Sequence, residues 1–282
     1  MTRSHVTADE LQPGDVAVLG VPFDAYSSYL RGPAKAPPLI RESLFSESAN
    51  TWTEGGIRLT ATPGWHLLGD LDLPESDAAV ARIEKAIGAV LDRGARVISL
   101  GGDHSITYPI LCAYGRKYSD LTIIQLDAHP DLYDEIDGNR LSHGCPFARI
   151  MEKKLAKRLV QVGVRAMTGH QREQAARFGV EVLEMKDVSV VENLVLDGPL
   201  YLSLDMDCLD PAFAPGISHW EPGGMSTRDV LKIIHRLDGK LVGADLVEYN
   251  PDRDPQGITA MVAAKLLKEI LGGMIEERST TP

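Results

Sequence analysis

Short hydrophobic runs rich in Val, Ile and Leu alternate along this chain with longer segments of mixed polarity. Runs of this length, bounded by turn-forming residues, are typical of buried β-strands. We predict strands at residues 16–21, 65–68, 97–100, 121–126, 159–163, 180–183, 200–204 and 241–247. The chain therefore contains enough strands for a large sheet.

The segments between these runs carry hydrophobic residues at helical spacing. In the first of them, Ile83, Ile87 and Leu91 recur every four residues and would share one face of a helix. We predict helices at residues 76–91, 105–116, 143–157, 172–178, 227–237 and 259–275. Residues 31–38 and 47–62 are rich in Gly, Pro, Ser and Thr, so we predict loops there.

Strands that alternate with helices indicate a parallel sheet that is covered on both faces. A barrel of eight strands and eight helices shows the same alternation, so this pattern alone leaves both architectures open. No linker, low-complexity segment or internal repeat divides the chain. We therefore predict one domain over residues 1–282.

The acidic composition narrows the classes of partner. The net charge is −11 and the pI is near 5.2, whereas nucleic-acid-binding domains are basic, so a small cationic substrate suits the chain better. No apolar stretch reaches the ~18 residues of a membrane span, and the first ten residues lack the apolar run of a secretory signal. Three scattered cysteines are typical of free thiols in a reducing compartment. We predict a cytoplasmic protein that binds neither nucleic acid nor membrane.

Three of the predicted strands lead into motifs rich in Asp and His. The candidate metal ligands in these motifs are His104, Asp127, His129, Asp131, Asp205 and Asp207. In an open parallel sheet, ligands bind just beyond the carboxyl ends of the strands. Four carboxylates on one rim repel one another unless cations neutralise them, and mixed Asp and His ligation suits Mn²⁺, Fe²⁺, Co²⁺, Ni²⁺ or Zn²⁺. One such motif alone is more often a helix cap or a loop anchor, but the three together predict a two-metal hydrolase.

The same motifs resemble those of the ureohydrolase family, which includes arginases and agmatinases. The matching motifs are Gly-Gly-Asp-His-Ser at 101–105, Asp-Ala-His-x-Asp at 127–131, and Ser-x-Asp-x-Asp-x-x-Asp-Pro-Ala-Phe-Ala-Pro-Gly at 203–216. Residues 27–38 and 218–224 are most similar to plant-type arginases and to their bacterial relatives, which are often called agmatinases. The resemblance implies an open three-layer α/β/α fold with a central, mostly parallel sheet of about eight strands, rather than a barrel.

The resemblance also implies how the ligands divide between two divalent ions, with Mn²⁺ first and Ni²⁺ or Co²⁺ as alternatives. One ion would be held by His104, Asp127, Asp131 and Asp205. The other would be held by His129, Asp127, Asp205 and Asp207, so that Asp127 and Asp205 bridge. A hydroxide between the ions would attack the guanidinium carbon and release urea and an amine.

The same resemblance assigns catalytic roles to Asp131, His143 and Glu248. His143 occupies the place of the family's active-site histidine, and imidazole suits proton transfer to a leaving amine near neutral pH. From the residues alone, a helix-capping role for His143 is equally open. Glu248 corresponds to the family's guanidinium-binding glutamate, since a carboxylate pairs well with a planar guanidinium. A Glu at a strand end is, however, more commonly a surface residue.

The residues that would bind the substrate's tail follow less directly. We take Asn139, Arg140 and Ser142, from the loop after the third ligand, as candidate substrate-binding residues, together with Trp220. Arg140 would favour a tail carboxylate, whereas the acidic residues at 134–137 would favour an ammonium group. A charged loop that contacts only solvent is an equal alternative. Trp220 would narrow the pocket, pack in the core or lie at a subunit contact.

Two classes of function follow from these residues. The first is an amidinohydrolase acting on agmatine or arginine, with guanidinobutyrate, free guanidine and formiminoglutamate as alternative substrates. The second is a non-catalytic, metal-binding member of the same fold. The presence of all six ligands together with His143 and Glu248 favours the enzyme. The resemblance further implies a homo-oligomer, either a trimer or a hexamer.

Overall fold

All eight predicted strands form, and they pair in one sheet in the order β2-β1-β3-β8-β7-β4-β5-β6. Their bounds are β1 Val16–Val21, β2 Trp65–Asp70, β3 Arg96–Gly101, β4 Thr122–Leu126, β5 Arg158–Val164, β6 Glu181–Glu184, β7 Leu200–Asp205 and β8 Leu241–Val247. Every neighbouring pair is parallel. The structure is a computed structural model that describes residues 5–237 and 241–276, so both ends of the predicted domain lie outside the described residues.

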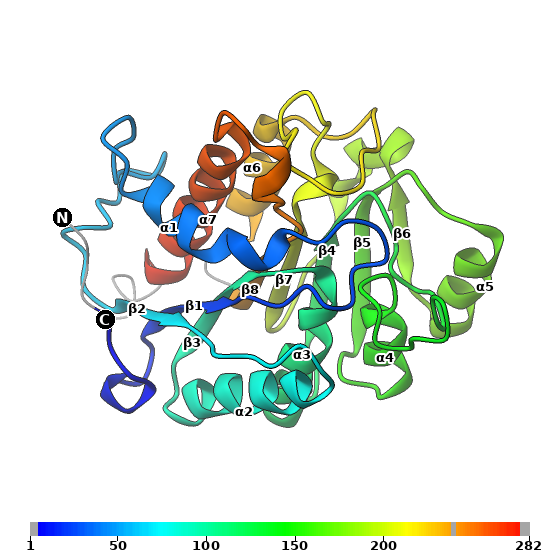
Figure 1. The fold of residues 1–282 in the computed structure, drawn as a ribbon, viewed down its shortest axis with the longest axis horizontal. Coiled ribbons are helices and arrows are strands. Elements are labelled where there is room, and N and C mark those ends of the chain that lie inside the picture. The colour runs from blue at the N-terminus through cyan, green and yellow to red at the C-terminus, as the bar shows by residue number, and fades with distance from the viewer. Residues whose placement is uncertain (1–4, 238–240, 277–282) are drawn as a thin grey trace.

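Helices cover both faces of the sheet (Figure 1). Their bounds are α1 Ala36–Leu44, α2 Ala78–Asp92, α3 Thr107–Lys117, α4 Pro146–Glu152, α5 Gly169–Phe178, α6 Thr227–Arg236 and α7 Ile258–Glu276. Short 3-10 segments are η1 Ala8–Glu10, η2 Pro33–Lys35, η3 His104–Ile106, η4 Met185–Asn193, η5 Met206–Cys208 and η6 Pro251–Arg253. Helices α1, α6 and α7 lie on one face, whereas α2, α3 and α4 lie on the other. The predicted three-layer α/β/α architecture is confirmed.

Alternate residues of each strand build two separate hydrophobic cores, because side chains in a strand point to opposite faces. In β1, Val16 and Val18 pack with the layer of α1, α6 and α7. Ala17 and Leu19 pack instead with the layer of α2 and α3. Strands that are buried on both faces read as continuous hydrophobic runs, which is why the sequence pattern located them.

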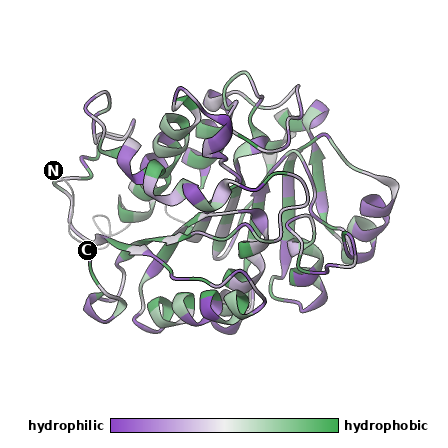
Figure 2. Cartoon of the chain, in the orientation of Figure 1, coloured by the Kyte–Doolittle hydropathy of each residue, from purple (hydrophilic) through white to green (hydrophobic). Residues whose placement is uncertain are grey.

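The helices differ in how deeply they are buried. Helix α7 is largely hydrophobic, since it packs between the sheet and its neighbours α1 and α6, whereas α5 at the margin is largely hydrophilic (Figure 2).

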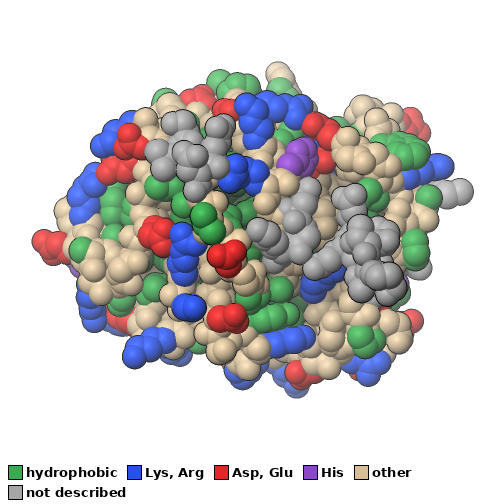
Figure 3. Space-filling view, turned by 180° about the vertical axis from the view of Figure 1, so that it is seen from behind, with side chains coloured by type: hydrophobic (Ala, Val, Ile, Leu, Met, Phe, Trp, Pro, Cys, Tyr) green, Lys and Arg blue, Asp and Glu red, His purple; other side chains and the backbone are tan. Residues whose placement is uncertain are grey.

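On the opposite side of the molecule, Lys and Arg side chains are interspersed with Asp and Glu (Figure 3). Among residues 5–237 and 241–276, no helix has both the length and the apolar composition needed to cross a membrane.

The predicted loop at residues 31–38 is wrong, because this stretch leads into helix α1 (Ala36–Leu44) through a 3-10 turn. Pro37 and Pro38 lie in the first turn of α1, where the helix needs no backbone N–H donor. Ile40 then anchors the helix in the core. The density of Pro and Gly at the start of α1 concealed its helical period.

Helix α4 (Pro146–Glu152) is shorter than the predicted helix at 143–157. It begins with Pro146 in its first turn, and Cys145 is the residue at its N-cap. It ends before Lys154, whose φ of 54° is incompatible with a continuing right-handed helix. His143 therefore lies before the helix and does not cap it.

Candidate active site

Four neighbouring strands at the centre of the sheet each lead into residues of the site. These strands lie side by side in the order β3, β8, β7 and β4. His104 follows β3, Glu248 follows β8, Asp205 ends β7 and Asp127 follows β4. His129 and Asp131 extend the loop after β4, and Asp207 lies in the turn after β7. All six predicted ligands thus meet at the carboxyl edge of the sheet, where ligands bind in open α/β folds.

One set of ligands surrounds His104. Its Nδ1 atom lies 3.2 Å from Oδ2 of Asp127, 3.0 Å from Oδ2 of Asp131 and 3.1 Å from Oδ2 of Asp205. These four side chains are buried, and their nearest ligand atoms all lie within 4.8 Å of one another. These four side chains are the ones predicted to hold the first ion.

A second set adjoins the first and shares Asp127 with it. His129 Nδ1 lies 2.9 Å from Oδ2 of Asp207 and 3.6 Å from Oδ1 of Asp127. Asp127 therefore directs one carboxylate oxygen toward each set. Asp205 is grouped with the first set, and its Oδ1 accepts the backbone N–H of Asp207, a member of the second set, at 2.8 Å. The structure thus places Asp127 in both sets, whereas the bridging role of Asp205 stays a prediction.

Hydrogen bonds beneath the site fix which nitrogen of His104 is available. Ser203 Oγ donates to Oδ1 of Asp245 at 2.7 Å, and Ser203 Oγ itself lies 2.9 Å from His104 Nε2. A hydroxyl has one proton to give, so Ser203 accepts the Nε2–H of His104. This tautomer turns the lone pair of Nδ1 toward the carboxylates, as metal-binding histidines require.

The geometry around His104 fits a cation. Among the described residues, Nδ1 of His104 is buried and has no hydrogen-bond partner, although three carboxylate oxygens surround it. A lone pair that faces three carboxylates is repelled by all of them. A divalent ion between these atoms would accept every one of them as a ligand, and the N and O donor set suits first-row divalent metals.

The pKa values of the ligands show the same crowding of negative charge. Burial, followed by the charges of Asp207 and Asp127, raises the pKa of Asp205 well above its ordinary value. Burial lowers the pKa of His129, but the charge of Asp207 and the hydrogen bonds of Asp127 and Asp207 outweigh it and raise this pKa to about 12. In the absence of cations, the site therefore neutralises itself by retaining protons.

A row of buried polar side chains crosses the sheet directly below the ligands. Strand register aligns its members in the order Ser99, Asp245, Ser203, Gln125 and Gln161. We call these five residues the polar row. Gln125 donates to Oδ2 of Asp127 at 2.6 Å, and Gln161 donates to the side-chain oxygen of Gln125 at 2.6 Å. The polar row therefore orients ligands of the site. Our sequence analysis missed this row, although each member interrupts a hydrophobic strand.

Glu248 and His143 form a charged pair at the edge of the site. Glu248 Oε1 lies 2.8 Å from His143 Nδ1 and accepts the backbone N–H of His104 at 2.9 Å. Burial lowers the pKa of His143, but the charge of Glu248 and its hydrogen bond raise it to about 9. Glu248 has a φ of 64° and Asp131 a φ of 48°. Such strained backbone in non-glycine residues is concentrated at functional sites.

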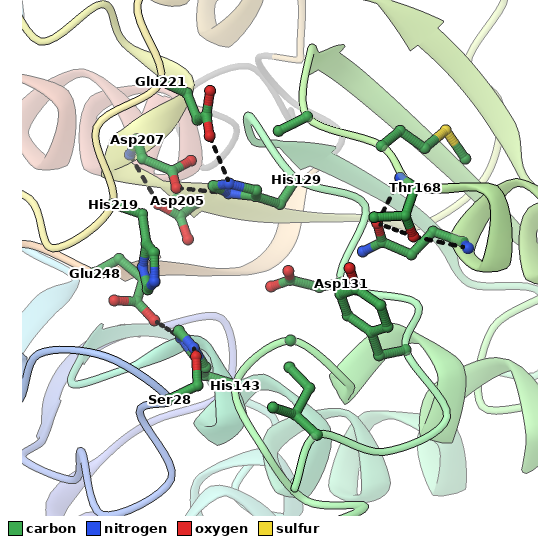
Figure 4. Close-up of a pocket in the computed structure, with 16 residues that line it drawn as sticks. Ser28, His129, Asp131, His143, Thr168, Asp205, Asp207, His219, Glu221 and Glu248 are labelled. Carbon is green, nitrogen blue, oxygen red and sulfur yellow. Dashed lines mark hydrogen bonds and ion pairs between the residues drawn. The ribbon is translucent and has the colours of Figure 1, made fainter.

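The two ligand sets and the charged pair border one cavity of about 380 Å³. In Figure 4, His129 and Asp207 lie on one side, Glu248 and His143 lie on the other, and Asp131 points into the space between them. His219 stands between the two sides, with its ring centre 5.3 Å from that of His143. Further lining residues include Ser28, Thr168, Gln171 and Glu221. We had assigned no role to these residues, although Ser28 and Glu221 lie in segments 27–38 and 218–224, which resemble plant-type arginases.

The candidates for binding the substrate's tail lie elsewhere. None of Asn139, Arg140, Ser142 and Trp220 is among the described residues that line the cavity. Arg140 is bound by Asp134 and Glu152, and Ser142 Oγ donates to the carbonyl of Tyr26. Asn139 Oδ1 accepts the N–H of Leu141 within its own turn. Trp220 is 52% exposed and stacks with Arg253, whose guanidinium carbon lies 4.1 Å from the ring centre.

Comparison with known proteins places these features in a family. Residues 14–272 match the sequence profile of the arginase family. The mitochondrial arginase 1 of Arabidopsis thaliana is 48% identical over 90% of this chain and 79% of its own length. A guanidinobutyrase of Pseudomonas aeruginosa is 35% identical over 96% of this chain and 90% of its own. The solved structure of the Medicago truncatula arginase superposes with a TM-score of 0.85 at 42% identity, covering 92% of this chain and 87% of that one.

Proposed function

Because the chain belongs to the arginase family, we propose that it is an amidinohydrolase that uses two divalent ions to hydrolyse the guanidinium group of arginine or agmatine. The observation that carries this proposal is the pair of overlapping ligand sets that share Asp127 and face the His143–Glu248 pair across one cavity. A protein that only bound metal would need neither a proton donor nor a guanidinium-binding carboxylate at this place.

Bound ions would supply Lewis acidity and bring the pKa of a water molecule toward neutrality. Mn²⁺ is our first expectation, since Asp and His together suit it, and Ni²⁺ or Co²⁺ are alternatives. The residues of this chain that would hold the ions are His104, Asp127, Asp131 and Asp205 in the first set, with His129 and Asp207 joining Asp127 in the second. The polar row would keep these side chains in place.

Glu248 would bind and orient the substrate. The hydrogen bonds described for its carboxylate use Oε1, so Oε2 is available for a guanidinium N–H. A charge-assisted hydrogen bond of this kind is about twice as strong as a neutral one. It would fix the plane of the guanidinium above the ligand sets, which places the carbon for attack.

His143 would supply the proton that the leaving amine needs. The charge of Glu248 favours the imidazolium form of His143, and an imidazolium beside the cleaved bond is a suitable general acid. An amine that leaves without a proton is a poor leaving group, so this proton transfer should limit kcat when His143 is absent.

The cavity suits a substrate with a positive charge. Its described lining contains the carboxylates Glu221 and Glu248 besides the ligands, and contains neither Lys nor Arg. A tail carboxylate would therefore have to be bound by uncharged donors such as Thr168 and Gln171. A tail ammonium group would instead pair with the carboxylate of Glu221. Arginine and agmatine share the guanidinium and differ at this end, so the choice between them requires measurement.

The decisive experiment is urea release by protein reconstituted with Mn²⁺ or with Ni²⁺. Arginine, agmatine, guanidinobutyrate, formiminoglutamate and guanidine should be compared at matched concentrations, with urea from arginine or agmatine expected. For formiminoglutamate, formamide rather than urea is the product to measure. His143→Ala should retain both ions and lower kcat by ~10²–10⁴-fold. Metal-loaded protein that turns over none of these compounds would contradict the proposal and favour the binding-only alternative.

A further inference from the structure

Ser28 forms a hydrogen-bonded chain with the charged pair. Its Oγ lies 2.8 Å from Nε2 of His143, whose other ring nitrogen is 2.8 Å from Oε1 of Glu248. Both nitrogens of His143 are therefore occupied. His143 is buried, whereas Ser28 is exposed and lines the cavity beside it (Figure 4). Ser28 thus stands on the outer side of His143.

The two hydrogen bonds of His143 are not equivalent. Glu248 Oε1 already accepts the backbone N–H of His104 at 2.9 Å, so the same carboxylate oxygen acts as an acceptor toward Nδ1 of His143. Nε2 then donates to Ser28 Oγ when His143 is protonated and accepts the hydroxyl proton of Ser28 when His143 is neutral. A hydroxyl can take either part, since it has one proton and two lone pairs. Ser28 can therefore follow His143 through a change of protonation state.

The loop that carries Ser28 is held in place from two directions. Oδ2 of Asp103 accepts the backbone N–H of Tyr26 at 3.2 Å and the hydroxyl of Ser27 at 3.1 Å. The carbonyl of Tyr26 accepts the backbone N–H of His143 at 3.2 Å. These bonds tie the loop both to the turn that precedes His104 and to His143 itself. The contact between Ser28 and His143 therefore belongs to a bonded framework.

We propose that Ser28 relays the proton from His143 to the leaving amine, an inference that rests on the proposed function. The leaving nitrogen carries the substrate's tail, and Ser28, which is exposed and lines the same cavity, would lie beside that tail on its way to solvent. The Nε2–H bond of His143 breaks as Ser28 Oγ gains that proton, and the O–H bond of Ser28 breaks as its proton passes to the nitrogen. The C–N bond breaks and its electron pair stays on the amine. The proton lost by the attacking water restores the imidazolium.

The test compares Ser28→Ala with Ser28→Thr and with Ser27→Ala, in Mn²⁺-loaded protein and with the substrate that the wild type hydrolyses fastest. Ser28→Ala should lower kcat by about 10- to 100-fold, less than the loss of a whole general acid, and should leave KM and the metal content unchanged. Added imidazole should restore kcat in Ser28→Ala, because a small acid can replace the missing hydroxyl. Ser28→Thr keeps the hydroxyl and should need no rescue. Ser27→Ala disturbs the same loop without touching His143 and should not respond to imidazole.

A second measurement does not depend on turnover. In metal-free protein labelled with ¹⁵N-histidine, Ser28→Ala should shift the Nε2 resonance of His143, and Ser27→Ala should leave it in place. A Ser28→Ala variant with wild-type kcat, a loss of kcat that imidazole fails to restore, or an unchanged Nε2 resonance would each overturn the relay. A wild-type protein that releases no urea would instead overturn the proposed function, and the resonance would still report whether Ser28 binds His143.

Discussion

Glu248 lies 2.8 Å from Nδ1 of His143, so the carboxylate expected to bind the guanidinium also holds the charge of the expected proton donor. In metal-free protein, His143 should therefore titrate near pH 9. Glu248→Gln should lower this pKa, because the effect of burial is then opposed only by the charges of Asp103 and Asp131. NMR titration of the histidine ring resonances measures both values. A His143 pKa that is the same in the two proteins would contradict the pairing.

The same pair makes a prediction about stability. The pKa of His143 is raised from 6.5 in the unfolded chain to about 9 in the folded one. The contribution of the pair is thus complete below pH 6.5 and is lost as the pH rises through about 9. The free energy of unfolding of metal-free protein, measured with urea, should fall over this interval. The fall should be smaller in Glu248→Gln, and an equal fall in both proteins would assign it to other groups.

Asp127 should matter more for metal content than Asp207. One oxygen of Asp127 faces each ligand set, whereas Asp207 belongs only to the second. Asp127→Asn should therefore weaken both ions, and Asp207→Asn should weaken one. Asp205→Asn distinguishes two cases: it should behave like Asp127→Asn if Asp205 bridges the ions, and like Asp131→Asn if it serves the first ion alone. Elemental analysis after dialysis against limiting Mn²⁺ tests this order, and equal losses in all four variants would refute the shared position of Asp127.

Ser203 should control metal affinity without touching a metal. Ser203→Ala removes the acceptor for the Nε2–H of His104, and loss of such a supporting partner typically costs about 10- to 100-fold in affinity. Ser99→Ala is the matched control, because Ser99 lies in the same polar row and its Oγ has no hydrogen-bond partner among the described residues. Competition with a chelator measures both affinities. Equal affinities in the two variants would exclude this role for Ser203.

Arg140→Ala should leave substrate preference unchanged. Arg140 does not line the cavity and is paired with Asp134 and Glu152 on the exterior. Loss of an exposed ion pair costs little stability, so a thermal melt should register at most a small shift. The measurement is the ratio of kcat/KM for arginine to that for agmatine. A change in this ratio of more than about threefold would restore Arg140 as a determinant of the tail.

The sequence located the strands well because parallel strands that are buried on both faces need hydrophobic residues at nearly every position. Helix α1 was missed for the opposite reason, since Pro37 and Pro38 are breakers in general but are tolerated in a first turn. Whether a proline ends a helix or begins one depends on the packing of later residues such as Ile40. That packing is a tertiary property.

The metal ligands were predictable because each lies at the end of a strand or within five residues after it, so the topology of the sheet brings them together. The tail-binding candidates stay predictions, because Arg140 and Trp220 lie on irregular loops whose course depends on contacts distant in sequence. Ser28 was missed for the same reason: 115 positions separate it from His143. Sequence reasoning reaches residues placed by regular structure, whereas His143, on a loop, was reached only through the family resemblance.

The polar row has a consequence for how the chain finds its fold. A strand that slips by one residue turns every side chain to the opposite face. In this sheet, such a slip would move Gln125 or Asp245 from its bonded partners into a hydrophobic layer, where an unsatisfied amide or carboxylate is costly. The polar row thus favours the native alignment of the central strands, because a misaligned sheet is higher in free energy even before any ion is present. The same few side chains thus serve both the orientation of the site and the alignment of the strands.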